Sequence, residues 1–455
     1  MDISCLFFTL EFVDPIFSGN GIHSRTIVES LLRYGCHVHV VCGIDASINS
    51  PSQFLANEVL KSAFKDGQLN ITSLPLHKWG HVSRIGPWEE YGKVTAEHAN
   101  SIVSDFLRNT TSGQRCAMGV DWSSWRPAEA CRNAWYEQTS NMLPMIHMNF
   151  RVYFEQPEQS DLSNDVEFYT KEERSACERA DTVIALTQAD LEALQRAGVI
   201  PSKVVRRCVL SPPIRADIEA AAADMTATAA PAAAELTDTS TSASISSWVS
   251  CRHYVTCCAR VCHEKNTLNG FVRIMEKIGS EQMASRNLVP LIFGRQTAPL
   301  YAQECIERLR TAFPAEGACA VLPFGGAKEM AEMWSRTRLN VHASVYESYG
   351  MVPIEAAAFN VPTICHKGDI ESIGFCDLLR EEDGQVFRTN LNNIEEAAAA
   401  MSVLLGLDTT DDGPQFETSI DTLRATAERA KSKALSWNSI AFAKTLMNIV
   451  QETCR

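Results

Sequence analysis

The sequence lacks several features that define common classes of protein. It has no run of 18 apolar residues, so we predict no transmembrane helix. Its start, Met1-Asp2-Ile3, lacks the positive charge and the long apolar region of a secretory signal, so we expect a cytoplasmic protein. Basic residues are fewer than acidic ones. The chain has 41 Lys and Arg and 55 Asp and Glu, which gives a net charge of −14. This balance disfavours a protein that binds nucleic acid or anionic membranes.

The chain has 16 cysteines but no C-x-x-C pair, which is the spacing typical of zinc sites. The densest group is Cys251, Cys257, Cys258 and Cys262, with His263 beside it. The group falls on a predicted buried strand and the turn after it. We therefore interpret these thiols as reduced packing residues and predict no metal site.

Strands and helices alternate in the first half of the chain. Residues 3–10 predict a buried strand, residues 22–34 a helix and residues 37–42 a second strand. This order indicates a βαβ unit and therefore a parallel sheet. Further strands are predicted at 116–120, 144–148, 182–186 and 204–210.

Residues 216–247 interrupt the alternation, because they are rich in Ala, Thr and Ser. Such low complexity predicts a linker or a disordered insertion. We therefore expect a first domain over 1–215, a linker over 216–247, a second domain over 248–435 and a C-terminal helix over 436–455.

The alternation resumes in the second half. Strands are predicted at 253–259, 288–293, 319–322 and 338–342, and helices at 267–280, 298–313, 353–359 and 394–405. The expected fold class is α/β, with two Rossmann-like domains that face each other across a cleft. A ligand would bind outside the carboxyl ends of the strands.

A glycine-rich segment precedes the first predicted helix. Gly19 and Gly21 allow backbone N–H groups to approach an anion at the helix N-terminus. The segment partly matches G-x-G-x-x-G, and Asp45 lies about where dinucleotide enzymes place a ribose-binding acid. A nicotinamide-dependent oxidoreductase is therefore one alternative. Ser24 replaces the third glycine, which favours a structural turn or a loop that faces a phosphate or a sugar.

Two cations follow the strand predicted at 253–259. Arg260 leaves the strand, and Lys265 lies in the turn before the next helix. The pair is able to clamp a diphosphate, Arg through its fork of donors and Lys as a point charge. Ordinary surface charges are the alternative interpretation.

Two carboxylates flank the start of the helix predicted at 353–359. Glu347 lies in the preceding loop and Glu355 in the first helical turn. Carboxylates accept hydrogen bonds from sugar or ribose hydroxyls, and the free N–H groups between them stabilise a phosphate. The alternative is a solvated Glu347 and a Glu355 that stabilises the helix dipole.

These motifs resemble, in type and order, those of the retaining glycosyltransferases of family 4, which have the GT-B fold. Glu347 to Glu355 looks like the family's E-x7-E motif, and Arg260 to Lys265 looks like its G-R-L-x-x-E-K-G segment. Further similar segments lie at 291–294, 322–326, 360–364 and 436–441, the last on a C-terminal helix that crosses back to the first domain. The resemblance covers most of 253–455 and is looser before it, at 19–23 and 180–187.

The resemblance implies a donor site. Arg260 and Lys265 would hold the donor diphosphate, and Glu347 would contact the donor sugar. Glu355 would contact the ribose. The other residues that the resemblance assigns to donor binding are Gly19, Gly21, Gly294, Phe324, Gly350, Met351 and Val352.

The implied reaction transfers a hexosyl group from a UDP- or GDP-linked sugar to an acceptor hydroxyl, with retention of anomeric configuration. The sequence has no D-x-D motif, so we expect a metal-independent reaction in which Arg260, Lys265 and helix N-termini neutralise the leaving group. No cofactor besides the donor is expected. The acceptor would be a carbohydrate, a lipid-linked sugar or a polyol, and residues 50–140 would shape its site. Peripheral membrane contact through that segment stays open.

One departure from the family concerns a histidine. The family often ends a strand of the first domain with a His near the transferred sugar, and here that position holds Phe150. His147 lies about three residues earlier. We take His147 as a candidate catalytic residue, with a core histidine as the alternative, and His23 and Asp121 as further acceptor-side candidates.

Two other functions compete with transfer. A non-catalytic subunit of the same fold, which binds a nucleotide-sugar or forms a complex, is suggested by the departures at Asn20 and Phe150. A nucleotide-sugar epimerase of similar two-domain shape is the other.

Overall fold

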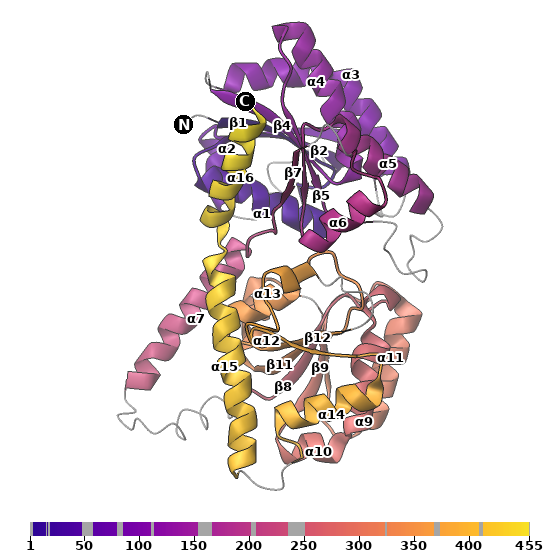
Figure 1. Ribbon diagram of the computed structural model, residues 1–455, viewed down its shortest axis with the longest axis vertical. Helices are drawn as coiled ribbons and strands as arrows, with labels where there is room; N and C mark the ends of the chain where they lie inside the picture. Colours follow the sequence, from indigo (N-terminus) through magenta and orange to yellow (C-terminus); the bar gives the residue numbers. More distant parts are fainter. Residues whose placement is uncertain are drawn as a thin grey trace. The chain divides into compact units, whose positions relative to one another are not determined.

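The computed structural model describes residues 3–14, 16, 19–47, 58–79, 85–110, 113–152, 166–201, 206–234, 251–323, 325–367, 374–408 and 413–454. The chain divides into two compact units, Met1–Pro213 with Ser439–Arg455, and Ile214–Asn438 (Figure 1). Each unit has a parallel sheet with helices packed on it. The α/β fold class predicted from the alternating pattern is confirmed.

The first unit contains a seven-stranded sheet in the order β3-β2-β1-β4-β5-β6-β7. All of its neighbouring strands run parallel. Its elements are β1 (Ile3–Thr9), α1 (Gly19–Arg33), β2 (His37–Asp45), α2 (Glu58–Lys65), β3 (Leu69–Leu76), α3 (Ile85–Asn109), β4 (Gln114–Val120), η2 (Trp122–Ser124), α4 (Trp125–Thr139), β5 (Met145–Asn149), α5 (Val166–Arg179), β6 (Thr182–Ala185), α6 (Gln188–Arg196), β7 (Arg206–Val209) and α16 (Ser439–Thr453).

The C-terminal helix α16 belongs to this first unit, where it packs beside α1 (Figure 1). Thr453 and Thr182 share a hydroxyl hydrogen bond of 2.7 Å, and Glu452 forms an ion pair with Arg206. The expected return of the C-terminal helix to the first domain is confirmed. On one face of the sheet, strand residues such as Leu6 and Phe8 pack with side chains of α3 and α4.

The second unit contains a six-stranded sheet in the order β10-β9-β8-β11-β12-β13, also parallel. Its elements are α7 (Ala216–Ala234), β8 (Tyr254–Cys258), η5 (His263–Lys265), η6 (Leu268–Val272), α9 (Arg273–Ile278), α10 (Ser280–Ser285), β9 (Val289–Phe293), α11 (Pro299–Ala312), β10 (Ala320–Leu322), α12 (Ala327–Ser335), β11 (Thr337–His342), α13 (Met351–Ala358), β12 (Thr363–His366), η7 (Gly374–Asp377), β13 (Phe387–Thr389), α14 (Ile394–Leu405) and α15 (Pro414–Ser436).

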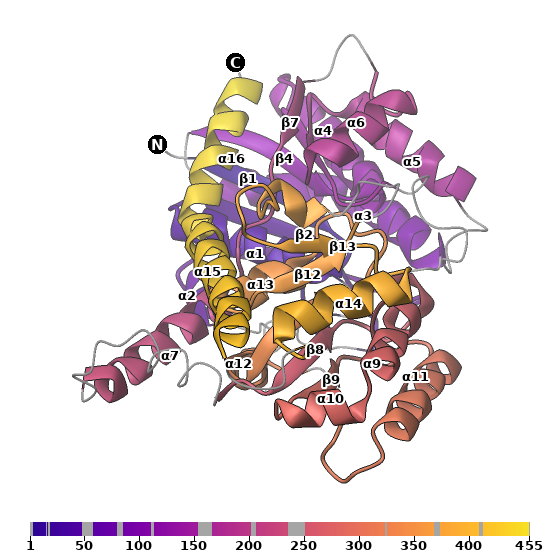
Figure 2. The same ribbon diagram turned by 60° about the horizontal axis from the view of Figure 1, so that its bottom comes forward.

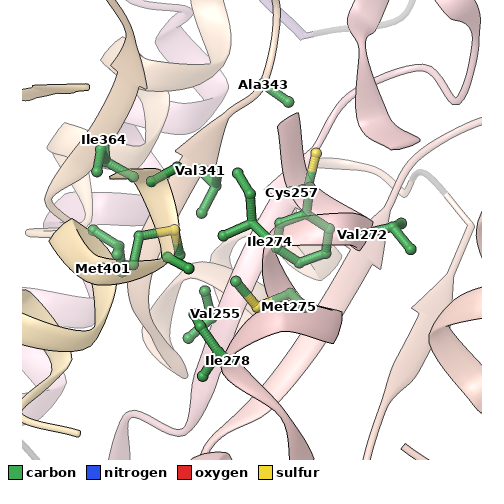
Figure 3. Packing of buried hydrophobic residues seen from close by; sticks show 14 of the residues in the cluster. Val255, Cys257, Val272, Ile274, Met275, Ile278, Val341, Ala343, Ile364 and Met401 are labelled. Carbon is green, nitrogen blue, oxygen red and sulfur yellow. The ribbon is translucent and has the colours of Figure 1, made fainter. Parts of the chain in front are cut away.

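The core of the second unit forms where alternate strand residues meet one set of helices. Val255 and Cys257 of β8 point to the same face, because side chains alternate along a strand. They pack with Val341 of β11, Ile274 of α9 and Met401 of α14 (Figure 3). Figure 2 shows α9, α11 and α14 on this side of the sheet and α12 and α13 on the other. This core fixes the strands whose carboxyl ends carry the candidate site.

The structure corrects the interpretation of residues 216–247 as a linker. Its first part is the helix α7, which packs against α12 and α13. Ile218 and Ala222 are buried. Alanine has the highest helix propensity, so the alanine-rich composition that looks like low complexity also favours a helix. Residues 235–250 lie outside the described residues.

No helix in the described part of the chain is long and apolar enough to cross a membrane.

Two strand ends approach each other closely beside the candidate site. A Cβ atom on Gly294, after β9, would lie 1.8 Å from the carbonyl oxygen of Ala259, after β8. The backbone N–H of Ala259 donates to Phe293 at 3.1 Å, and that of Val261 donates to Arg295 at 2.9 Å. Only glycine allows this contact, which fixes the start of the loop that carries Arg260.

We predict that Gly294→Ala lowers the free energy of unfolding by about 2–3 kcal/mol, because the backbone contact leaves no room for a methyl group. The midpoint of urea unfolding, followed by tryptophan fluorescence, measures the change. Gly326→Ala is the matched control, because its Cβ would meet only the flexible carboxylate of Glu329, at 3.2 Å, and should cost less than about 1 kcal/mol. Equal midpoints for both variants would contradict the prediction.

Candidate active site

The candidate site lies at the carboxyl edge of the second sheet, where two neighbouring strands end. Strands β8 and β11 pair in parallel, so the loops that follow them meet at the same edge. Lys265, at the end of η5, forms an ion pair with Glu347 in the loop after β11. The Lys265 and Glu347 side chains are 17% and 21% exposed. The structure thus brings together two of the residues that the sequence assigns to the donor site.

Two further side chains approach the same oxygen of Glu347. The hydroxyl of Ser344 donates to Oε2 at 3.5 Å, and Nε2 of His342 lies 3.9 Å from it. Burial lowers the pKa of His342 to about 4, so its ring is neutral at pH 7. Lys265 therefore brings a positive charge to Glu347, and the neutral ring of His342 brings none.

The helix α13 starts directly after this cluster. Its N-cap, Gly350, has φ +77°, and a Cβ there would lie 3.0 Å from Cγ of Glu347 and 3.2 Å from the ring of Phe375. Met351 and Val352 are the first helical residues, so their N–H groups lack intrahelical partners. The backbone N–H of Gly374 donates to the Glu347 carbonyl at 2.9 Å. The segment around η7 thus packs against the loop that presents Glu347.

Glu355 occupies a different environment, inside α13. Its side chain is 4% exposed, and Oε1 accepts a hydrogen bond from Nη1 of Arg215 at 3.4 Å. Burial raises the pKa of Glu355 to about 7, although the positive charge of Arg215 opposes the shift. Burial also raises the pKa of the neighbouring Cys258 thiol, and the carboxylate of Glu355 adds to that shift. This carboxylate is therefore not a solvated surface charge.

The other implied cation, Arg260, is more exposed than Lys265. Its side chain is 45% exposed, and it forms an ion pair with Glu264 at 3.4 Å. Gly294 serves the close contact of β8 and β9 described above. Phe324 lies outside the described residues.

In the first unit, the glycine pair lies within the first turn of α1, where the sequence predicts a loop. A Cβ on Gly21 would lie 2.8 Å from Ile16 and 3.0 Å from Glu11, whereas Gly19 has open space around it. Gly21 therefore serves packing, and Gly19 lies at a helix N-terminus. The side-chain amide of Asn20 donates to Asp121 at 2.7 Å.

His147 lies in the middle of β5 and is fully buried. Burial lowers its pKa to about 4. Phe150, just after the strand, packs against the ring of His23 at 5.2 Å. This is the location of a core histidine, with no exposed surface through which His147 would contact a substrate.

Asp45, the acid that the dinucleotide alternative requires, ends β2 and accepts a hydrogen bond from the N–H of Ser47 at 2.9 Å. This bond lowers the pKa of Asp45. The carboxylate caps a local turn.

Three residues that lie beside the predicted carboxylates were not indicated by the sequence, namely Arg215, Ser344 and His342. Arg215 falls at the boundary of the predicted linker, where no local pattern relates it to residue 355. His342 ends a predicted strand, and only its position at the carboxyl edge would have drawn attention to it. Among the described residues, no group of three or more His, Cys, Asp or Glu side chains is placed to hold a metal ion.

Part of the chain matches a known protein family. Residues 252–406, about a third of the chain, match the family model described as glycosyl transferases group 1. This segment contains Arg260, Lys265, Glu347 and Glu355. A search of curated proteins returns no match.

Solved structures show the fold of the whole chain. Sucrose-phosphate synthase from Thermosynechococcus elongatus has 16% identity and a TM-score of 0.68, over 99% of this chain and 98% of that chain. HepE from Anabaena in complex with UDP and glucose has 13% identity and a TM-score of 0.60, over 98% and 99%. The UDP-forming trehalose-phosphate synthase from Burkholderia xenovorans in complex with glucose-6-phosphate has 11% identity and a TM-score of 0.62, over 99% of this chain and 100% of that chain. The chain has the GT-B fold.

We predict that His147 lowers the stability of the folded protein in acid, because its ring is buried in the neutral form and must be protonated there. Its pKa is about 4 in the folded state and about 6.5 unfolded, so its contribution to stability is complete above pH 6.5 and is lost as the pH falls toward 4. The loss amounts to at most about 3 kcal/mol.

Urea unfolding between pH 7 and pH 4 tests this prediction. His147→Gln should flatten the pH dependence of the unfolding midpoint. The exposed His98 is the control, and His98→Gln should leave the slope unchanged. An unaltered slope in His147→Gln would show that this histidine is not a buried neutral base.

Proposed function

We propose that this chain is a retaining glycosyltransferase that moves a hexosyl group from a nucleotide-sugar to an acceptor hydroxyl. The Lys265–Glu347 pair beside the N-terminus of α13 carries the proposal, because it joins a cation, a carboxylate and free N–H groups at the carboxyl edge of a parallel sheet. The match to glycosyl transferases group 1 covers the same segment. HepE with UDP and glucose and the UDP-forming synthase favour a UDP-linked donor over a GDP-linked one.

In the proposed donor site, positive groups bind the diphosphate and carboxylates bind the hydroxyls. The N-terminus of α13 and Lys265 receive the diphosphate, since both offer positive charge to an anion. Arg260, the more exposed cation, adds a forked donor. Glu347 accepts hydrogen bonds from hydroxyls of the donor sugar, and Glu355 from those of the ribose. When a phosphate replaces Glu347 as the ion-pair partner of Lys265, the Glu347 carboxylate becomes available to the hydroxyls of the sugar.

The proposed reaction is a front-face displacement. The acceptor hydroxyl attacks the anomeric carbon on the face from which the diphosphate leaves, so the configuration is retained. The new bond joins the anomeric carbon to the acceptor oxygen, the bond to the phosphate oxygen breaks, and the acceptor proton passes to that departing oxygen. Lys265, Arg260 and the N–H groups of α13 stabilise the charge that develops on the diphosphate. We propose that these groups act without a metal ion, and that the acceptor is a carbohydrate, lipid-linked sugar or polyol.

A second candidate is a non-catalytic subunit that binds a nucleotide-sugar. It is favoured by the first unit, where Asn20 is hydrogen bonded to Asp121 and His147 is buried in the sheet. Release of UDP from a bound donor, with or without an acceptor, distinguishes an enzyme from such a subunit.

We predict that UDP-sugars raise the melting temperature of the protein, because a ligand that binds only the folded state stabilises it. Lys265→Ala should weaken binding by about 10- to 100-fold, since it removes a charged hydrogen-bond donor. Lys277→Ala is the control, because Lys277 pairs with Glu395 on the surface of the same unit. The panel includes UDP-sugars, GDP-sugars, NAD and NADP. Stabilisation by NAD alone would overturn the assignment.

We predict that transfer proceeds with retention and persists in excess EDTA. Proton NMR of the product formed from a UDP-α-hexose, within the first turnovers, should show an α-linkage. Glu347→Gln should lose most of the activity. A β-linked product would contradict the proposed mechanism, and activity restored only by added Mg²⁺ or Mn²⁺ would contradict the metal-independent step.

A further inference from the structure

Arg215 links two carboxylates of the second unit. Its Nε and Nη2 donate to the two oxygens of Asp217 at 3.1 and 2.6 Å, and its Nη1 donates to Glu355 at 3.4 Å. Asp217 is half-exposed, whereas Glu355 is buried. The guanidinium is therefore held by its fork on the solvent side and presents its remaining nitrogen to the buried carboxylate.

The backbone around Arg215 is fixed on both sides. The N–H of Ile214 donates to the carbonyl of Trp437 at 3.4 Å, and the N–H of Ile218 donates to Asp217 at 2.9 Å. The helix α7, which begins at Ala216, packs against α13, where Glu355 lies. Arg215 therefore lies directly before α7, a helix that packs against the one carrying Glu355.

We infer that Arg215 is the positioning residue for the nucleotide ribose, because its Nη1 donates to Glu355 and holds that side chain oriented for the ribose hydroxyls. The inference rests on the proposed function, which gives Glu355 the ribose. It adds a residue outside the segment that the family model matches.

The electrostatics of Glu355 show why a partner is needed. A buried carboxylate without a positive neighbour is protonated more easily, and a carboxyl group accepts fewer hydroxyl hydrogen bonds than a carboxylate. Of the described groups that act on Glu355, Arg215 lowers its pKa, and Asp217 of the same segment raises it. The thiol of Cys258, on β8, is the third titratable neighbour. Arg215 is the only cation among them.

The consequence is a pH-dependent affinity. Because the pKa of Glu355 is about 7, ribose binding should strengthen as the pH rises through 7. Loss of Arg215 removes the attraction that favours the ionised form, so the rise should move to higher pH. Arg215→Lys keeps the charge but not the fork, and should give an intermediate profile.

Calorimetric titration of UDP and of 2′,3′-dideoxy-UDP between about pH 6 and pH 9 tests the inference. In Arg215→Ala, UDP affinity at pH 7 should fall about tenfold and recover toward pH 9, and the preference for UDP over the dideoxy analogue should vanish at pH 7. Glu355→Gln should lose that preference at every pH, and its profile records the titration of the diphosphate itself. Arg308→Ala is the control, because Arg308 also forms a two-bond pair, with Glu276, on the same unit.

The outcomes separate the inference from the proposed function. If Glu355→Gln binds UDP and its analogue as the wild type does, the donor site itself is misassigned. If Glu355→Gln loses the preference while Arg215→Ala and Arg215→Lys keep the wild-type profile, Arg215 has no positioning role and the proposed function stands. If the pH profile of UDP affinity in Arg215→Lys lies between those of the wild type and Arg215→Ala, the inference is supported. An Arg215→Lys profile shifted to higher pH than the wild type supports it even where the alanine variant is unstable.

Discussion

The parallel pairing of β8 with β11 is the constraint on which the candidate site depends. Because both strands end at one edge, residues 82 positions apart in sequence, Lys265 and Glu347, come into contact. The core of Val255, Cys257 and Val341 holds the two strands in register. The close contact at Gly294 fixes the start of the loop after β8, which leads to Lys265.

Strong local patterns in the sequence predicted most of the sheet and part of the site. The helix expected at 394–405 is α14, and the strand expected at 338–342 is β11, because apolar spacing fixes both. The strand β3 was missed because Asn70, Thr72 and Pro75 break the apolar pattern, which an edge strand tolerates. The pairing of Arg215 with Glu355 depends on how α7 packs, and no local signal contains that information.

The two carboxylates of the E-x7-E segment differ in what surrounds them. Glu347 lies in a loop, partly exposed, where a lysine, a hydroxyl and a neutral histidine approach one of its oxygens. Glu355 lies within a helix, buried against a thiol and an arginine. The two glutamates thus differ in their burial and in the groups that contact them.

The return of α16 makes the first unit discontinuous along the chain, because Ile214–Asn438 is inserted between its two parts. During synthesis, the N-terminal part is complete long before the helix that packs beside α1 has been made. Until then the apolar positions that meet Leu446 and Met447 stay uncovered. The first unit therefore reaches its final packing only after the whole second unit has left the ribosome, and a chain that stops early exposes a surface that promotes aggregation.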